Sequence, residues 1–258
     1  MGIVFQTNKA LVRDYGEETA VIRDILIEPG REQSQVKLAA LSSLESDRLL
    51  RKLDTLAMQT MDPSIATMLA EEAQAIMVLV RVVKTETKES FMGVLGSGSN
   101  LDIAWLRAQH IGSVLTRGTA AADNLGIWSQ VPFTVGAETW LHTVTPNAAE
   151  IYWPTQTMRE EAGVIHLGVI DPIEVPKIDS ITFTIAGIPS SAQSLNLQVR
   201  KQFGTNQSPI VRFEKPVLIG PEKTQMITVF PFTAGDTRLQ LLSLIVAQAQ
   251  QLTVDLGA

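Results

Sequence analysis

The sequence contains three histidines, His110, His142 and His166, and histidine is the side chain most often used for proton transfer and metal binding near neutral pH. No two of them have the H-x-x-x-H spacing that places two ligands on one helix face. His142 and His166 lie in strand-like segments, and side chains on separate strands could still meet in space. The pattern favours interior or edge histidines with hydrogen-bond partners, and we expect no metal and no cofactor.

Glycines at positions 93, 96 and 98 raise the question of a phosphate-binding loop. The stretch lacks the G-K-[ST] ending whose lysine reaches the phosphates, and its G-x-x-G-x-G spacing differs from the dinucleotide-binding fingerprint. The segment that follows does not read as a parallel strand–helix–strand unit. We therefore interpret Gly93, Gly96 and Gly98 as a hinge between helical elements.

The sequence also contains no recognisable motif for catalysis by serine or by paired carboxylates. Ser190-Ser191 follows a proline in a turn-like segment, and the sequence has no G-x-S-x-G elbow to activate a serine. The adjacent pairs Glu71-Glu72 and Glu160-Glu161 look solvent-exposed. Sequence alone does not exclude a pair of carboxylates brought together by folding. The remaining acidic residues that we considered are isolated in the sequence: Asp102, Asp123, Glu138 and Glu150.

Four aromatic residues, Trp128, Trp140, Tyr152 and Trp153, recur at intervals of about twelve residues in the second half of the chain. A row of such rings could stack on sugars, as in a carbohydrate-binding module. Aromatic side chains also carry large apolar areas in protein cores and at subunit interfaces. The composition favours the core or interface interpretation, and sugar stacking remains the alternative.

Composition limits the classes of function. The chain has 258 residues, a net charge of -6 and no cysteine, which excludes disulfides and thiolate sites. The densest basic group, Arg48, Arg51 and Lys52, is mixed with acidic residues, so we expect no direct nucleic-acid binding. The N-terminal residues do not resemble a signal peptide, and the longest apolar run, 75–83, is too short for a transmembrane segment.

The elements that must position these residues fall into two regions. Leucines at helical spacing from Leu38 to Leu56 predict one helix, and Asp62-Pro63 predicts the start of a second that continues to about Val83. These two helices should form an antiparallel hairpin with a short connection at 60–63. Asn100 looks like the N-cap of a third helix over 101–116.

After Gly126 the apolar pattern changes to a period of two, and most aromatic residues lie at or beyond Trp128. In 180–185 apolar and polar residues alternate cleanly, which is typical of antiparallel sheets with one wet face. The segment Leu239–Gln251 is ambiguous, and we predict a strand for its first part. The predicted strands are 130–135, 139–145, 149–153, 163–170, 178–187, 194–203, 209–213, 224–232, 237–246 and 252–256.

We therefore expect an α+β protein: residues 1–120 mainly helical with short N-terminal strands, and residues 121–258 an antiparallel β-sandwich, with a jelly roll as one arrangement. Residues 3–5 and 20–27 also read as strands. If those strands pair with the C-terminal region, the helices are an insertion into one β-domain.

The largely apolar segment 224–256 contains only three charged residues, Asp236, Arg238 and Asp255. A monomer would have difficulty hiding so much apolar strand, and subunit contact would help to explain it. We therefore expect a non-enzymatic structural subunit that assembles with itself and with other assembly proteins, in a virion or phage particle or during cytoplasmic assembly. A carbohydrate-binding module is the alternative, and a hydrolase of unfamiliar type is a further one.

Overall fold

The computed structural model describes residues 38–60, 62–93, 99–106, 142–171, 176–185, 188–189, 193–194, 210–237 and 239–252. This part of the chain contains helices followed by antiparallel sheets, which confirms the α+β class. The expected strands at 3–5, 20–27 and 130–135 lie outside the described residues. So does the boundary between 120 and 121, and the two-region division therefore stays a prediction.

Side-chain hydrogen bonds cap the first turns of the first two helices. The longer helices that the structure describes are α2 (Ser43–Thr60), α3 (Pro63–Glu71) and α4 (Ala73–Thr87). Ser42 and Glu45 form a reciprocal capping box at the start of α2, in which the Ser42 hydroxyl accepts from the Glu45 N–H at 3.2 Å. Asp62 caps α3 by accepting from the Ser64 N–H at 2.8 Å, with Pro63 at the first helical position. The predicted connection near residues 60–63 is confirmed, but the second predicted helix is interrupted at Glu72.

The predicted third helix over 101–116 is wrong at its start. Residues Leu101–Trp105 form the strand β1, which pairs antiparallel with β11 (Gln240–Gln248). Leu101 and Ile103 are buried against the helices, so the segment follows a strand period that five residues are too few to reveal. Asn100 is not an N-cap, and its carbonyl instead accepts from the Ala249 N–H. Residues 107–116 lie outside the described part.

Two larger sheets and one small sheet contain the strands. The strand orders are β1-β11-β4-β8 in the four-stranded sheet, β3-β9-β5-β6 in the five-stranded sheet, where β7 also pairs with β5, and β10-β2 in the small sheet. The remaining elements are β2 (His142–Val144), β3 (Glu150–Thr157), β4 (Gly163–Ile170), β5 (Ile178–Ile185), β6 (Ile188–Pro189), β7 (Gln193–Ser194), β8 (Ile210–Ile219), β9 (Thr224–Pro231), β10 (Gly235–Thr237) and the short helix α7 (Ala249–Leu252).

Most predicted strands that fall in the described part are present. The segment 163–170 coincides with β4, and β3, β5, β8 and β9 overlap their predicted ranges with shifted ends. The first part of the ambiguous segment 239–251 is a strand, as predicted, and it ends in α7. Only β7 is described from the region of the predicted strand 194–203, and 253–256 lie outside the description.

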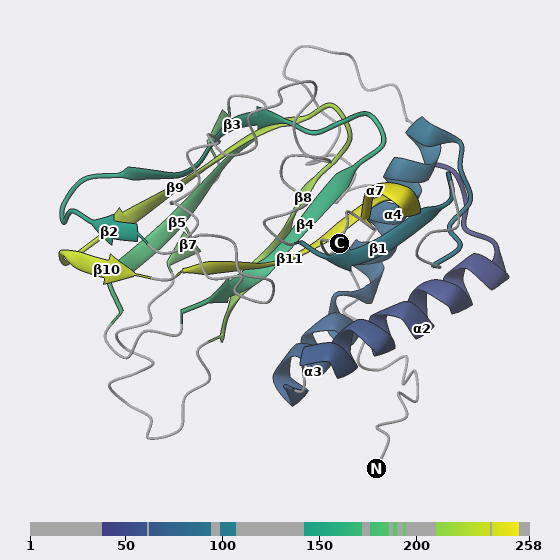
Figure 1. Cartoon of the computed structure of the whole chain (residues 1–258), viewed down its shortest axis with the longest axis horizontal. Helices are drawn as coiled ribbons and strands as arrows, with labels where there is room; N and C mark the ends of the chain where they lie inside the picture. Colours follow the sequence, from purple (N-terminus) through teal and green to yellow (C-terminus); the bar gives the residue numbers. More distant parts are fainter. Residues whose placement is uncertain are drawn as a thin grey trace, which may run out of the picture.

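The four-stranded sheet is covered on both faces. Along β4 and β11 nearly every residue is buried, because odd and even positions pack against different neighbours. One face of this sheet shares a core with α2, α3 and α4, and the other shares a second core with β3, β5 and β9. Figure 1 accordingly shows the helices gathered at one side of the sheets. The five-stranded sheet instead shows alternating burial along β5 and β9.

This layering changes one expectation from the sequence. The low charge of residues 240–248 needs no partner subunit, since the same chain buries both faces of β11. In the described part of the apolar C-terminal segment, the outward-facing residues of β9 are not buried in this way.

Gly168 lies where the backbone of β8 passes close to β4. A Cβ atom there would lie 2.4 Å from the backbone oxygen of Val211. At Gly163, on the same strand, a Cβ would meet the flexible end of Leu79 at 2.7 Å. We expect Gly168→Ala to lower the free energy of unfolding by about 2 kcal/mol. The loss of unfolding free energy in Gly163→Ala should be clearly smaller, because the side chain of Leu79 can move more easily than the paired backbone of β8. Urea unfolding followed by circular dichroism measures both, and an equal or larger loss for Gly163→Ala would contradict this account.

Candidate functional site

A histidine lies at the centre of the core between the two larger sheets. The Nδ1 atom of His166, on β4, is 2.7 Å from the Ser243 hydroxyl of β11, and its Nε2 atom is 2.9 Å from Oε1 of Gln225 on β9. With the amide in this orientation, Nε2 carries the proton and Nδ1 accepts from the serine. The imidazole stacks on Phe183 at a centroid distance of 5.1 Å and meets the Trp153 ring at a steep angle.

The serine–histidine pair is not arranged for catalysis. Ser243, His166 and Gln225 are all buried, and no substrate can reach the hydroxyl from solvent. The third member is a neutral amide rather than a carboxylate that would stabilise an imidazolium. Burial lowers the pKa of His166 from 6.5 to about 4, against the opposing effect of its hydrogen bond to Gln225. The imidazole is therefore neutral at pH 7, as the interpretation of an interior histidine with hydrogen-bond partners requires.

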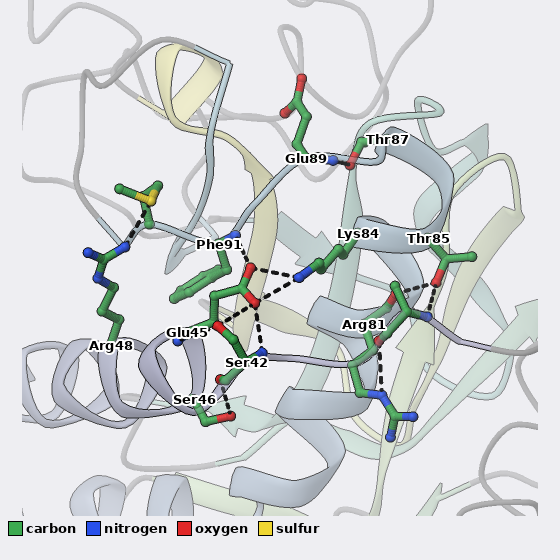
Figure 2. Close-up of polar contacts among 12 residues, drawn as sticks. Ser42, Glu45, Ser46, Arg48, Arg81, Lys84, Thr85, Thr87, Glu89 and Phe91 are labelled. Carbon is green, nitrogen blue, oxygen red and sulfur yellow. Dashed lines mark hydrogen bonds and ion pairs between the residues drawn. The ribbon is translucent and has the colours of Figure 1, made fainter.

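A second buried polar cluster joins the helices to one another. Figure 2 shows the Glu45 carboxylate of α2 between Lys84 of α4, Ser42 and the backbone of Phe91. Lys84 Nζ lies 2.8 and 2.7 Å from the two carboxylate oxygens, and the N–H groups of Ser42 and Phe91 donate at 2.8 and 3.0 Å. Burial alone raises the pKa of Glu45, but these donors outweigh it and lower the pKa to about 2. The cluster therefore holds a charged carboxylate beneath the start of α2.

Three further ion pairs attach the helical layer to the four-stranded sheet. Lys52 of α2 lies 3.0 Å from Asp102 of β1, whose side chain is wholly buried. Arg212 of β8 binds Glu71 and Glu72 at the junction of α3 and α4. Burial alone lowers the pKa of Arg212, but the two carboxylates outweigh it and raise the pKa. Glu72 is buried, so the expectation of a solvent-exposed Glu71-Glu72 pair is wrong for Glu72, and Asp102 is isolated only along the sequence.

The aromatic residues singled out in the sequence divide into two groups. Tyr152 and Trp153 of β3 are buried between the sheets, and the Tyr152 hydroxyl donates to the Leu239 carbonyl at 3.0 Å. Neither ring is open to a ligand. Trp128 and Trp140 lie outside the described residues, so a sugar-stacking platform would have to be built from those two.

The glycine-rich segment also differs from expectation. It leads from α4 to the strand β1 rather than to another helix, so it is not a hinge between helical elements. Gly93 has a φ of +64°, a conformation that favours glycine. Gly96 and Gly98, together with Ser190-Ser191, His110, Asp123 and Glu138, lie outside the described residues, and the side chain of His142 is not described.

The described ranges contain no group of three or more histidine, aspartate and glutamate side chains placed to hold a metal ion. None of the helices in this part of the chain is both long enough and apolar enough to cross a membrane.

The outer face of the five-stranded sheet is the surface with the least ordinary composition. Register places Ile151, Thr228 and Thr182 in one row across β3, β9 and β5, with Phe230 beside Ser180 and Met226 beside Thr184. Ile151 is 55% exposed and Phe230 is 40% exposed. We call these seven residues the outer face; none is charged, and the exposed Asp179 lies next to them where β5 begins. Charge patterning along β9 could have revealed this face, because its outward residues are hydroxyl or apolar, whereas β5 also contains the exposed Asp179.

Comparison with known proteins adds little to this description. No protein-family model matches the sequence, and no curated protein matches it. Among solved structures, dimeric latent PorU from Porphyromonas gingivalis is similar over 62% of this chain and 14% of the PorU chain, at 9% sequence identity and a TM-score of 0.22. A likeness at that score carries no argument about fold or function.

The Glu45 cluster can be tested by removing its charge. We expect Glu45→Gln to lower the free energy of unfolding by about 2–3 kcal/mol, because Lys84 is left without its buried partner. Asp47→Asn removes the same charge from an exposed position on the same helix, and we expect a change within about 0.5 kcal/mol. Urea unfolding at pH 7 measures both, and similar losses in the two variants would contradict the role of the cluster.

The same cluster predicts acid sensitivity at low pH. Because the pKa of Glu45 is about 2 in the folded protein and 4.5 without its partners, its contribution to stability is complete above pH 4.5 and is lost as the pH falls toward 2. Glu45→Gln should therefore flatten the decline in unfolding free energy over that range. Parallel pH profiles for the two proteins would contradict the prediction.

Proposed function

We propose that this protein is a non-enzymatic structural subunit that associates with copies of itself through the outer face. The observation that carries the proposal is the combination of exposed Ile151 and Phe230 with a surrounding row of hydroxyl side chains and no charge. An exposed β-sheet face of this kind contrasts with the charged surfaces that keep monomers apart.

A second copy is the partner that fits this composition best. In a two-fold contact the same patch meets itself, so charge of one sign on the patch would be present twice within the contact. The seven residues of the outer face avoid the repulsion between such like charges. Threonine and serine hydroxyls both donate and accept hydrogen bonds, and they can therefore pair with their own copies across such a contact.

The face suits this contact better than the edge of the sheet. Among the described strands β3 lies at an edge of its sheet, and it contains Pro154 and two register shifts along its pairing with β9. Proline and bulges on an edge strand oppose the addition of a further strand. The contact we propose is therefore a packing of side chains, with no continuous sheet across the two subunits.

For the β-region we propose a β-sandwich of the jelly-roll type, supported by two antiparallel sheets that share one core. The kind of assembly we propose is a virion or phage particle, formed with other assembly proteins and without direct binding of nucleic acid by this chain. This part of the proposal rests on architecture, and fold-level likeness is weaker support than a defined contact surface.

The contact can be tested by placing charges on the outer face. We expect sedimentation analysis to show concentration-dependent association of the unaltered protein, and Phe230→Asp or Ile151→Asp to weaken it by about tenfold or more, because each new charge appears twice in a two-fold contact. Met58→Asp is the matched control, since Met58 is 58% exposed on α2 and away from the outer face. A strict monomer at every concentration, or equal weakening by Met58→Asp, would contradict the proposal.

A further inference from the structure

The buried cluster around His166 joins the two larger sheets through one titratable group. Its polar partners come from opposite sides: Ser243 belongs to the four-stranded sheet and Gln225 to the five-stranded sheet. Within the apolar core that the two sheets share, this bridge is a polar connection between the two layers. It satisfies the hydrogen-bonding needs of a neutral imidazole, with one nitrogen donating and the other accepting.

Among the described residues, no acidic side chain pairs with the ring as a counter-ion for a charged imidazolium. The side chains that hydrogen-bond to the ring or stack against it are Trp153, Phe183, Gln225 and Ser243, and none of them carries a negative charge. A buried charge without an ionic partner is strongly unfavourable. Uptake of a proton therefore favours states in which water reaches the ring.

Ionisable residues on the neighbouring strands do not supply the missing charge. Arg212 on β8 pairs with Glu71 and Glu72 in the helical layer, on the other side of the sheet. Two of the other ionisable residues on the strands of the two sheets, Lys215 and Asp179, are exposed, and the side chain of Glu214 is not described. The remaining ones have other partners: Glu150 accepts from the Thr145 N–H, Asp102 pairs with Lys52, and the Tyr152 hydroxyl donates to the Leu239 carbonyl. Neither β4 nor β11 contains any other ionisable side chain.

We propose that His166 is an acid-sensitive link between the two sheets, which stabilises their contact while it is neutral and opens that contact when it is protonated. The shift in the pKa of His166 has the direction that this geometry requires, since burial lowers the pKa to about 4. The unfolded chain binds a proton near pH 6.5, so the contribution of His166 to stability is complete above that pH and is lost as the pH falls toward 4. The link is a property of one chain and does not depend on self-association.

Unfolding measured against pH tests the link. Relative to His166→Gln, we expect the unfolding equilibrium constant of the unaltered protein to rise roughly a hundredfold more between pH 6.5 and pH 4. The double variant His110→Gln/His142→Gln removes the other two imidazoles and should retain the unaltered profile. Parallel profiles for the unaltered protein and His166→Gln would overturn the proposal, and so would loss of the effect in the double variant.

A second variant keeps the test decisive if His166→Gln does not fold. Gln225→Glu places an anion beside Nε2, which should raise the pKa of His166 and remove the loss of stability between pH 6.5 and pH 4. An unchanged loss in Gln225→Glu would contradict the role of the imidazole.

Thiol labelling locates the opening, because the chain has no cysteine of its own. Val229→Cys places a thiol in the core between the sheets, and Val246→Cys places one in the core beneath the helices. With dithiodipyridine, which reacts with thiols at acid pH, we expect labelling of Val229→Cys to accelerate as the pH falls from 6.5 to 4, and labelling of Val246→Cys to change less. Equal acceleration at both positions would show loosening of the whole molecule and would overturn a specific link between the sheets.

Discussion

The structure depends on covering both faces of one antiparallel sheet. β4 and β11 lie at its centre and are buried along almost their whole length, so each face needs its own apolar layer. Helices supply one layer and the five-stranded sheet supplies the other. An antiparallel sheet more often leaves one face to solvent, and that arrangement gives the alternating pattern seen here only in β5 and β9.

Burial on both faces makes the few enclosed polar groups important. Several of them bridge two elements that apolar contact alone would hold less firmly in register. Glu45 and Lys84 fix α2 against α4, Lys52 and Asp102 fix α2 against β1, and His166 joins the two sheets. Apolar packing is non-directional, whereas a buried hydrogen bond is satisfied in only one register. These groups therefore specify how the layers fit together, although burial of the layers supplies most of the stability.

The sequence predicted the elements whose signals are local. Asp62-Pro63 marks a helix start by capping chemistry, and the alternation in 180–185 marks a half-buried strand, because each signal depends only on neighbouring residues. The capping box at Ser42 and Glu45 is also local and would have placed the start of α2. Leu101–Trp105 was misread because five residues cannot distinguish a strand from a helical turn, and its pairing with β11 is a contact between distant segments. The burial of Glu72 and the pairing of Asp102 were unpredictable for the same reason, since Arg212 and Lys52 reach them only in the folded chain.

The low charge of the C-terminal segment does not have a single explanation along its length, and the sequence alone could not show this. In β11 both faces are buried within the chain, so the absence of charge is a requirement of folding. In β9 the inward residues meet the same requirement, but Met226, Thr228 and Phe230 face outward and could be charged without disturbing the core. Their neighbours Thr182, Thr184 and Ile151 are equally free of that requirement. Folding does not account for the missing charge at these outward positions, which is why the outer face, and not the apolar C-terminal segment as a whole, is the basis for proposing self-association.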